Sequence, residues 1–280
     1  MERNQDVAKS KLDFEFLARG YFAFDEPVPY NVDNGEIYIK PITVRQSETF
    51  LASSDILAYN KNAIPSVEII QMSYLEFLIR VVLQTEVNQA KFQNILKYCL
   101  GIEDFRIKID ENKKLYIVDT KNNLIIRHKQ FEDIRRIIMY QNIPHYDDHY
   151  IDPELKKAMD ATDELRNRNV TMPTLERKFA IITAHSGISK KEQMEMTFRS
   201  HCLLFEEICG EVEFTTIRPI ALYAGKGKEL DHWIYKKPKN KFDGYITEVD
   251  KYAQNLGTTN AEIPIANTSQ YQQLYDNFKK

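Results

Sequence analysis

The spacing of hydrophobic residues in the first half of the chain predicts three helices. Thr43 and Gln46 have the capping-box pattern, in which each side chain bonds a free backbone N–H of the first turn, so a helix is expected from about Thr43 to Tyr59. A second helix is expected to open at Pro65, and a third to end at Gly101. The second helix carries an apolar stripe formed by Val67, Ile70, Tyr74, Phe77, Leu78 and Val81.

Strand-like alternation of apolar and polar residues occurs in two places. Asn34-Gly35 is a hairpin turn signal beside an alternating stretch, so residues 1–42 are predicted to form an extended arm with a hairpin. Three further alternating stretches lie at 105–109, 115–118 and 124–126. Residues 43–144 are therefore predicted to hold helices plus a three-stranded meander, and to close with a helix that ends before Pro144.

The following part of the chain, residues 145–237, is predicted to be a helical bundle. The polar loop His145–Asp152 is the predicted domain boundary. Ser189 and Glu192 form a second capping box, and the helix that they open is expected to stop at Gly210. Its apolar face is made by Met194, Phe198, Cys202, Phe205 and Cys209.

The stretch Phe214–Tyr235 holds the only tryptophan, Trp233. A short helix is expected from about Thr215 to Gly225, with Pro219 in its first turn. Trp233 is then expected to be largely buried against Phe198, Cys202 and Phe205, because a large aromatic gains most by covering an apolar surface. Residues 238–280 are predicted to be a polar tail. The expected fold class is α+β and predominantly α: N-terminal helices with a small antiparallel β-meander, then a C-terminal helical bundle.

Composition narrows the class of protein. The 280 residues are 43% hydrophobic and 28% charged, a balance typical of a soluble globular protein. No apolar run has the length of a membrane span, and no signal peptide pattern follows the first methionine, so we expect a cytoplasmic protein with its three cysteines reduced. A net charge of −3 argues against bulk attraction to nucleic acid.

One segment gathers metal-ligand residue types. His145, Asp147, Asp148 and His149 are the kinds of side chain that a divalent metal requires, as in a metal-dependent hydrolase. Their spacing matches no established zinc or iron motif, and a solvated acidic loop explains them equally well. We expect no bound metal and no cofactor.

Other patterns that could support catalysis or binding have simpler structural interpretations. His185 beside Ser186, and His201 beside Cys202, are neighbours on a helix and point about 100° apart, which is unsuitable for activating a nucleophile. Six lysines lie between Lys226 and Lys241, interleaved with aromatics. They suggest a nucleic-acid-binding protein as an alternative function, whereas the ordinary reading is a solvated lysine face.

A resemblance to a known group of proteins rests on several segments of the second half. They are Phe131–Asn142, the capping box at Ser189, Leu204–Ile208, Ile220–Gly225 and Leu230–Ile234. The order and spacing of their hydrophobic, Gly and His-Trp positions resemble proteins encoded in the tail-morphogenesis regions of phages of Gram-positive bacteria. The resemblance covers roughly half of the chain and includes no catalytic signature.

This resemblance implies a non-enzymatic protein of tail or baseplate assembly, either an assembly chaperone or a virion component. Its partners would be other tail proteins (tape measure, tube or baseplate), and its location the host cytoplasm during assembly or the virion tail, with no role at a membrane. The residues expected to bind the partner are Tyr223, Lys226, Lys228, His232, Trp233 and Tyr235.

Overall fold

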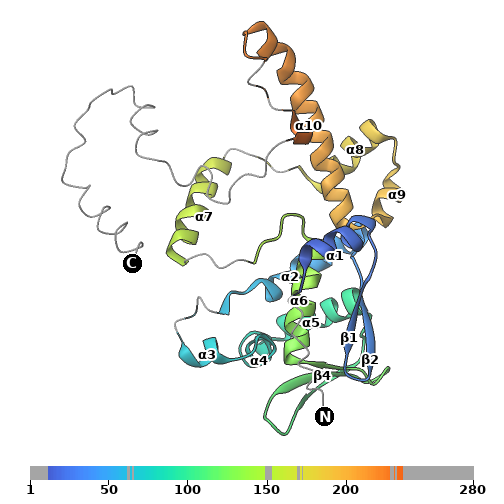
Figure 1. Cartoon of the computed structure of the whole chain (residues 1–280), viewed down its shortest axis with the longest axis vertical. Coiled ribbons are helices and arrows are strands. Elements are labelled where there is room, and N and C mark those ends of the chain that lie inside the picture. The colour runs from blue at the N-terminus through green and yellow to red at the C-terminus, as the bar shows by residue number, and fades with distance from the viewer. Residues whose placement is uncertain are drawn as a thin grey trace, which may run out of the picture. The chain divides into compact units, whose positions relative to one another are not determined.

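In a computed structural model of the chain, the described residues are 12–61, 64, 66–148, 153–168, 171, 173–227, 230 and 232–235. Their contacts divide the chain into two units, one made of Met1–Pro153 and Thr171–Trp233 and the other of Glu154–Val170 and Ile234–Lys280. The fold is predominantly α-helical with two small antiparallel sheets, which confirms the predicted fold class (Figure 1).

The elements of the first unit that precede residue 143 follow the predicted order closely. They are α1 (Phe14–Gly20), η1 (Phe22–Phe24), β1 (Val28–Val32), β2 (Gly35–Ile39), η2 (Val44–Gln46), α2 (Ser47–Ala58), α3 (Val67–Gln71), α4 (Tyr74–Arg80), η4 (Val82–Gln84), α5 (Glu86–Ile95), η5 (Leu96–Leu100), β3 (Phe105–Ile109), β4 (Leu115–Asp119), β5 (Ile125–Arg127) and α6 (His128–Asn142).

The hairpin predicted near the N-terminus is present. Strands β1 and β2 pair antiparallel, and Asn34 takes the left-handed conformation (φ 70°) that the tight turn needs. The prediction of an extended arm before it is wrong over the described residues, because α1 and η1 form there and bury Leu17 and Phe22 in the core. Burial of these two large side chains outweighs the turn-rich composition that suggested an arm.

The predicted helix after Pro65 is two helices, α3 and α4, and Pro65 itself lies outside the described residues. The break occurs at Ser73, whose Oγ accepts a hydrogen bond from the N–H of Glu76 at 3.2 Å and so caps α4. As a result only Tyr74, Phe77 and Leu78 of the predicted stripe are buried. Val67 is 71% exposed, whereas Phe77 is 2% exposed.

Helix α6 lies at the centre of the first unit. It packs against α2, α4, β1, β2, β5 and α10. The helix ends before Pro144 as predicted, and its apolar residues Phe131, Ile134, Ile137 and Ile138 are all buried. The meander β3-β4-β5 is confirmed, and so is the end of the third predicted helix at Gly101, which has φ 70°.

The remaining elements are helical, as predicted. They are α7 (Pro153–Asn167), α8 (Leu175–Ser186), α9 (Lys190–Glu195), α10 (Phe198–Tyr223) and the short turn η7 (Trp233–Tyr235). The prediction of a domain boundary at 145–152 is wrong for α8, α9 and α10. These three helices belong to the same unit as the N-terminal elements. The predicted tail, 238–280, lies outside the described residues.

The division of the last helices also differs from the prediction. The capping box at Ser189 is present, with the Glu192 carboxylate accepting from the Ser189 N–H at 2.8 Å, but the helix that it opens ends at Glu195. Thr197 then caps α10 through a hydrogen bond from the Ser200 N–H to its Oγ1 at 3.3 Å. Helix α10 continues through Gly210 and Pro219, so the predicted short helix from Thr215 is the second half of one long helix.

A three-way junction ties this last helix to the first half of the chain. The Phe198 N–H donates to Ile42 O and the Val44 N–H donates to Met196 O, both at 2.9 Å, which forms a short antiparallel bridge. The Ile42 N–H donates to Oδ1 of Asn142 at 2.8 Å. Asn142, at the end of α6, is fully buried and also donates to Ile138 O. The start of α10 is therefore fixed to the segment between β2 and α2, and through Ile42 to the end of α6.

Candidate protein-interaction site

The second half of α10 and the segment that follows it form the candidate site. The helix ends at Tyr223, where the Lys226 N–H donates to Ala221 O at 2.8 Å and Gly225 takes a left-handed conformation (φ 71°). The chain then turns back along the helix. Two faces of α10 result, one covered by the returning segment and one exposed.

The covered face depends on a glycine. A Cβ built on Gly210 would lie only 2.9 Å from Cδ1 of Trp233, so the missing side chain makes room for the indole. The Trp233 ring lies 5.2 Å from the ring of Phe214 and stacks on His232 at 4.1 Å. Its Nε1 donates to a carboxylate oxygen of Glu207 at 3.2 Å. Trp233 thus docks on the middle of α10.

This position corrects the prediction for Trp233. The indole is half-buried, and its ring and hydrogen-bond partners lie between Glu207 and Phe214 rather than at Phe198, Cys202 and Phe205. The prediction failed because it took Gly210 as a helix end. In the structure Gly210 stays helical and provides the notch that the indole fills.

The exposed face carries an apolar stripe at helical spacing, which we call the open stripe. Tyr223 is 95% exposed, Ile220 65% and Val212 42%. Thr216 and Pro219 are exposed as well and complete a line with intervals of three and four residues along the helix. The open stripe consists of Val212, Thr216, Pro219, Ile220 and Tyr223.

The six predicted partner-binding residues are divided by the structure. Tyr223 and Lys226 are exposed at the end of α10, and Tyr235 is 80% exposed. His232 and Trp233 stack on each other and both contact the ring of Phe214 at a tilted angle, so they hold the returning segment in place. Lys228 lies outside the described residues. The sequence prediction missed Val212 and Ile220, because it began a new helix near Thr215. In the unbroken helix α10 these two residues line up with Tyr223.

Two of the four residues weighed as metal ligands, Asp148 and His145, have other partners. The Asp148 carboxylate accepts hydrogen bonds from Arg136 and Tyr140, and although burial acts to raise the pKa of Asp148, these bonds lower it below its ordinary range. Nε2 of His145 lies 2.9 Å from Oε2 of Glu206, and His149 lies outside the described residues. Within the described part of the chain, no three His, Cys, Asp or Glu side chains are grouped to hold a metal ion.

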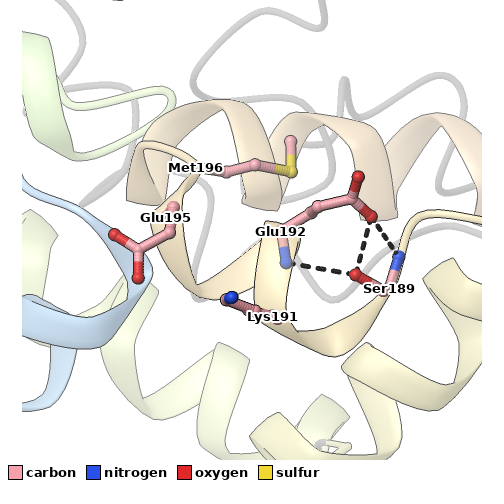
Figure 2. A pocket seen from close by; sticks show the side chains of 5 residues that line it. All are labelled: Ser189, Lys191, Glu192, Glu195 and Met196. Carbon is pink, nitrogen blue, oxygen red and sulfur yellow. Dashed lines mark hydrogen bonds between the residues drawn. The ribbon is translucent and has the colours of Figure 1, made fainter.

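A surface groove lies on α9 and is lined by Ser189, Lys191, Glu192, Glu195 and Met196 (Figure 2). Figure 2 shows the Glu192 carboxylate turned toward Ser189, where it closes the capping box. Glu195 pairs with Arg45 at 2.5 Å. Both carboxylates of the groove thus have structural partners.

The neighbours His201 and Cys202 do not form an activated pair. Burial raises the pKa of the Cys202 thiol, which favours the unreactive form. His201 is fully buried, its ring meets the edge of Phe179 at 5.3 Å, and neither ring nitrogen has a hydrogen-bond partner. Burial and the nearby charge of Lys178 hold the pKa of His201 below its ordinary value of 6.5. His201 is therefore a neutral residue of the core, and its two buried ring nitrogens without hydrogen bonds lower the stability of the fold.

Comparisons with known proteins add no assignment. Neither the protein-family models, nor the curated proteins, nor the solved structures contain a match to this chain. Among the described helices, none combines the length and the apolar character that crossing a membrane requires.

The notch at Gly210 predicts a specific effect of adding one methyl group. Gly210→Ala should displace Trp233 from α10, so that emission of this single tryptophan moves to the red and acrylamide quenching rises. Helicity should be kept, since Ala favours a helix interior over Gly by about 1 kcal/mol. Gly20→Ala is the matched control, because no atom lies within 4 Å of a Cβ there. Unchanged quenching in Gly210→Ala would contradict the docked position.

The buried His201 predicts a loss of stability in mild acid. Above its ordinary pKa of 6.5 the imidazole is neutral in both the folded and unfolded chain. As the pH falls below that value, the unfolded chain binds a proton that the folded chain binds only at its lowered pKa, so the free energy of unfolding decreases. His201→Met should remove this decrease and raise stability at neutral pH by about 1 kcal/mol, since the unpaired nitrogens are lost.

Urea unfolding across this pH range measures both effects. His185→Met is the control for replacing a histidine by methionine, because His185 is exposed on α8 and lies outside the core. An equal loss of stability in acid for the native chain and His201→Met would contradict the assignment.

Proposed function

We propose that the protein is a non-enzymatic phage tail or baseplate assembly protein that acts through protein–protein contacts, as an assembly chaperone or as a virion component. The observation that carries the proposal is the open stripe on α10. A line of exposed apolar side chains ending in Tyr223, which is 95% exposed, is the kind of surface that protein interfaces bury.

The way α10 is anchored in the fold also supports the proposed function. Its first turns are fixed by the junction with Ile42 and Asn142, and its middle is braced by Trp233, so the open stripe is held on a rigid element. A preorganised surface loses little conformational freedom on association, which favours binding. The resemblance to tail-morphogenesis proteins supplies the partner class: tape measure, tube or baseplate proteins, met in the host cytoplasm during assembly or in the virion tail.

Replacing two residues of the open stripe tests this function. In cells infected by the phage that encodes the protein, the tagged native chain should co-purify with tail proteins identified by mass spectrometry. Ile220→Ser with Tyr223→Ser should reduce that recovery at least about tenfold, the loss expected for roughly 1.4 kcal/mol of binding free energy. The melting temperature should stay the same, because both side chains are exposed.

Val67→Ser with Val87→Ser is the control pair, since these side chains are 71% and 66% exposed on other helices. It should leave recovery unchanged. A native chain that co-purifies with no tail protein would contradict the proposed function.

A further inference from the structure

We propose that the outer edge of strand β3 binds an extended segment of a partner protein in which acidic and apolar residues alternate. The segment adds a further strand to the meander β3-β4-β5, a mode of recognition in which backbone hydrogen bonds give affinity and alternate side chains give specificity. This surface is separate in sequence from the open stripe of α10, and the inference does not rest on the proposed function.

Strand β3 is the edge of the meander that is open to another strand. The opposite edge is occupied, because Ile125 of β5 exchanges two backbone hydrogen bonds with Asp33, at 3.1 and 3.0 Å. That bridge joins the meander to the turn of the N-terminal hairpin. In the described part of the chain, β3 pairs with β4 on one side, and no strand pairs with its other side.

The register of β3 shows which of its backbone groups point outward. At its two ends the Thr120 N–H donates to Asp104 O at 3.0 Å, and the Asp110 N–H donates to Lys114 O at 2.9 Å. Hydrogen-bonded positions alternate along an antiparallel pair, so the even-numbered residues of β3 bond β4. The N–H and C=O of the odd-numbered residues, Ile107 among them, therefore face the open edge.

The apolar face of β3 extends beyond the core that it belongs to. Ile107 lies opposite Ile117, and Ile109 lies opposite Leu115. The two partners on β4 are buried, whereas Ile107 is 38% exposed and Ile109 63% exposed. Apolar side chains on an added strand would cover these two isoleucines and continue the buried face of the meander.

The other face of β3 selects acidic side chains. Arg106 and Lys108 alternate with the isoleucines, both are exposed, and neither forms a salt bridge in the described part of the chain. The nearby acidic residues all lie beyond the ends of the strand, and they are Glu103, Asp104, Asp110 and Glu111. Two of these already pair with other cations, at 3.6 and 3.8 Å. Carboxylates opposite Arg106 and Lys108 would form favourable cross-strand pairs.

The same two cations argue against a second copy of this chain as the added strand. Two copies related by a two-fold axis would pair their β3 strands antiparallel about Ile107. Arg106 of one copy would then lie opposite Lys108 of the other, twice in the pair, and like charges directly opposite each other destabilise a sheet. The edge therefore favours a different, acidic strand.

A synthetic peptide tests the site on the purified full-length chain. Labelled Thr-Val-Glu-Val-Glu-Val-Thr with blocked ends should bind saturably by fluorescence anisotropy, and the same peptide with Lys in place of Glu should not. Arg106→Glu with Lys108→Glu should weaken binding of the Glu peptide at least about tenfold, since two attractive cross-strand pairs become repulsive. This double variant should also gain binding of the Lys peptide.

Lys190→Glu with Lys191→Glu is the matched control. Both side chains are exposed in the first turn of α9, where acidic residues are favoured, and the change in net charge is the same. This pair should bind the Glu peptide as the native chain does. An equal loss of binding in the two double variants would mark a general charge effect and overturn the inference.

Amide hydrogen exchange by NMR tests the backbone pairing. In the free chain the amides of Arg106 and Lys108 should be protected by β4, and those of Ile107 and Ile109 should exchange rapidly. Saturating Glu peptide should slow exchange at Ile107 and Ile109. No saturable binding up to about 1 mM peptide, or binding that leaves these two amides unprotected, would overturn the inference. Neither result bears on recovery of tail proteins through the open stripe.

Discussion

The hydrogen bonds that join Ile42, Asn142 and Phe198 hold together three parts of the chain that are distant in sequence. Ile42 follows the N-terminal hairpin, Asn142 ends the central helix α6, and Phe198 begins α10. The Asn142 side chain is fully buried and satisfied at both ends, so this polar group specifies one arrangement of the three elements. Asp25 adds to the junction by accepting from the Ser200 hydroxyl at 2.8 Å.

A helix fixed at one end can present a functional surface along the rest of its length. In α10 the face that receives Trp233 gives rigidity, and the opposite face leaves apolar residues exposed. Gly210, at the middle of α10, and Pro219, in its second half, are residues that weaken a helix interior. The cost at Gly210 is offset by docking of the indole, whereas Pro219 is exposed and adds apolar surface to the open stripe.

The sequence predicted elements whose signals are local. The hairpin at Asn34, the meander and the helix end at Gly101 depend on turn residues and on the period of apolar positions, and all are present. Features that depend on distant contacts were missed. The bridge between Thr43 and Thr197 breaks the predicted helix after Glu195, and Trp233 makes Gly210 a notch rather than a helix end. In the candidate site, Tyr223 was predicted from the sequence as a partner-binding residue. The open stripe as a whole could be recognised only once α10 was known to be one continuous helix.

Amide hydrogen exchange measured for the chain alone and for the chain with its proposed tail partner tests the central claim that α10 has a fixed start and an interface at its far end. The amides of Ile42, Val44 and Phe198 should be strongly protected in both samples, because their hydrogen bonds lie within one folded unit. The amides from Val212 to Tyr223 should exchange more slowly in the presence of the partner, as the open stripe becomes covered. Equal exchange of the Val212–Tyr223 amides in both samples, or rapid exchange at Phe198, would contradict this account.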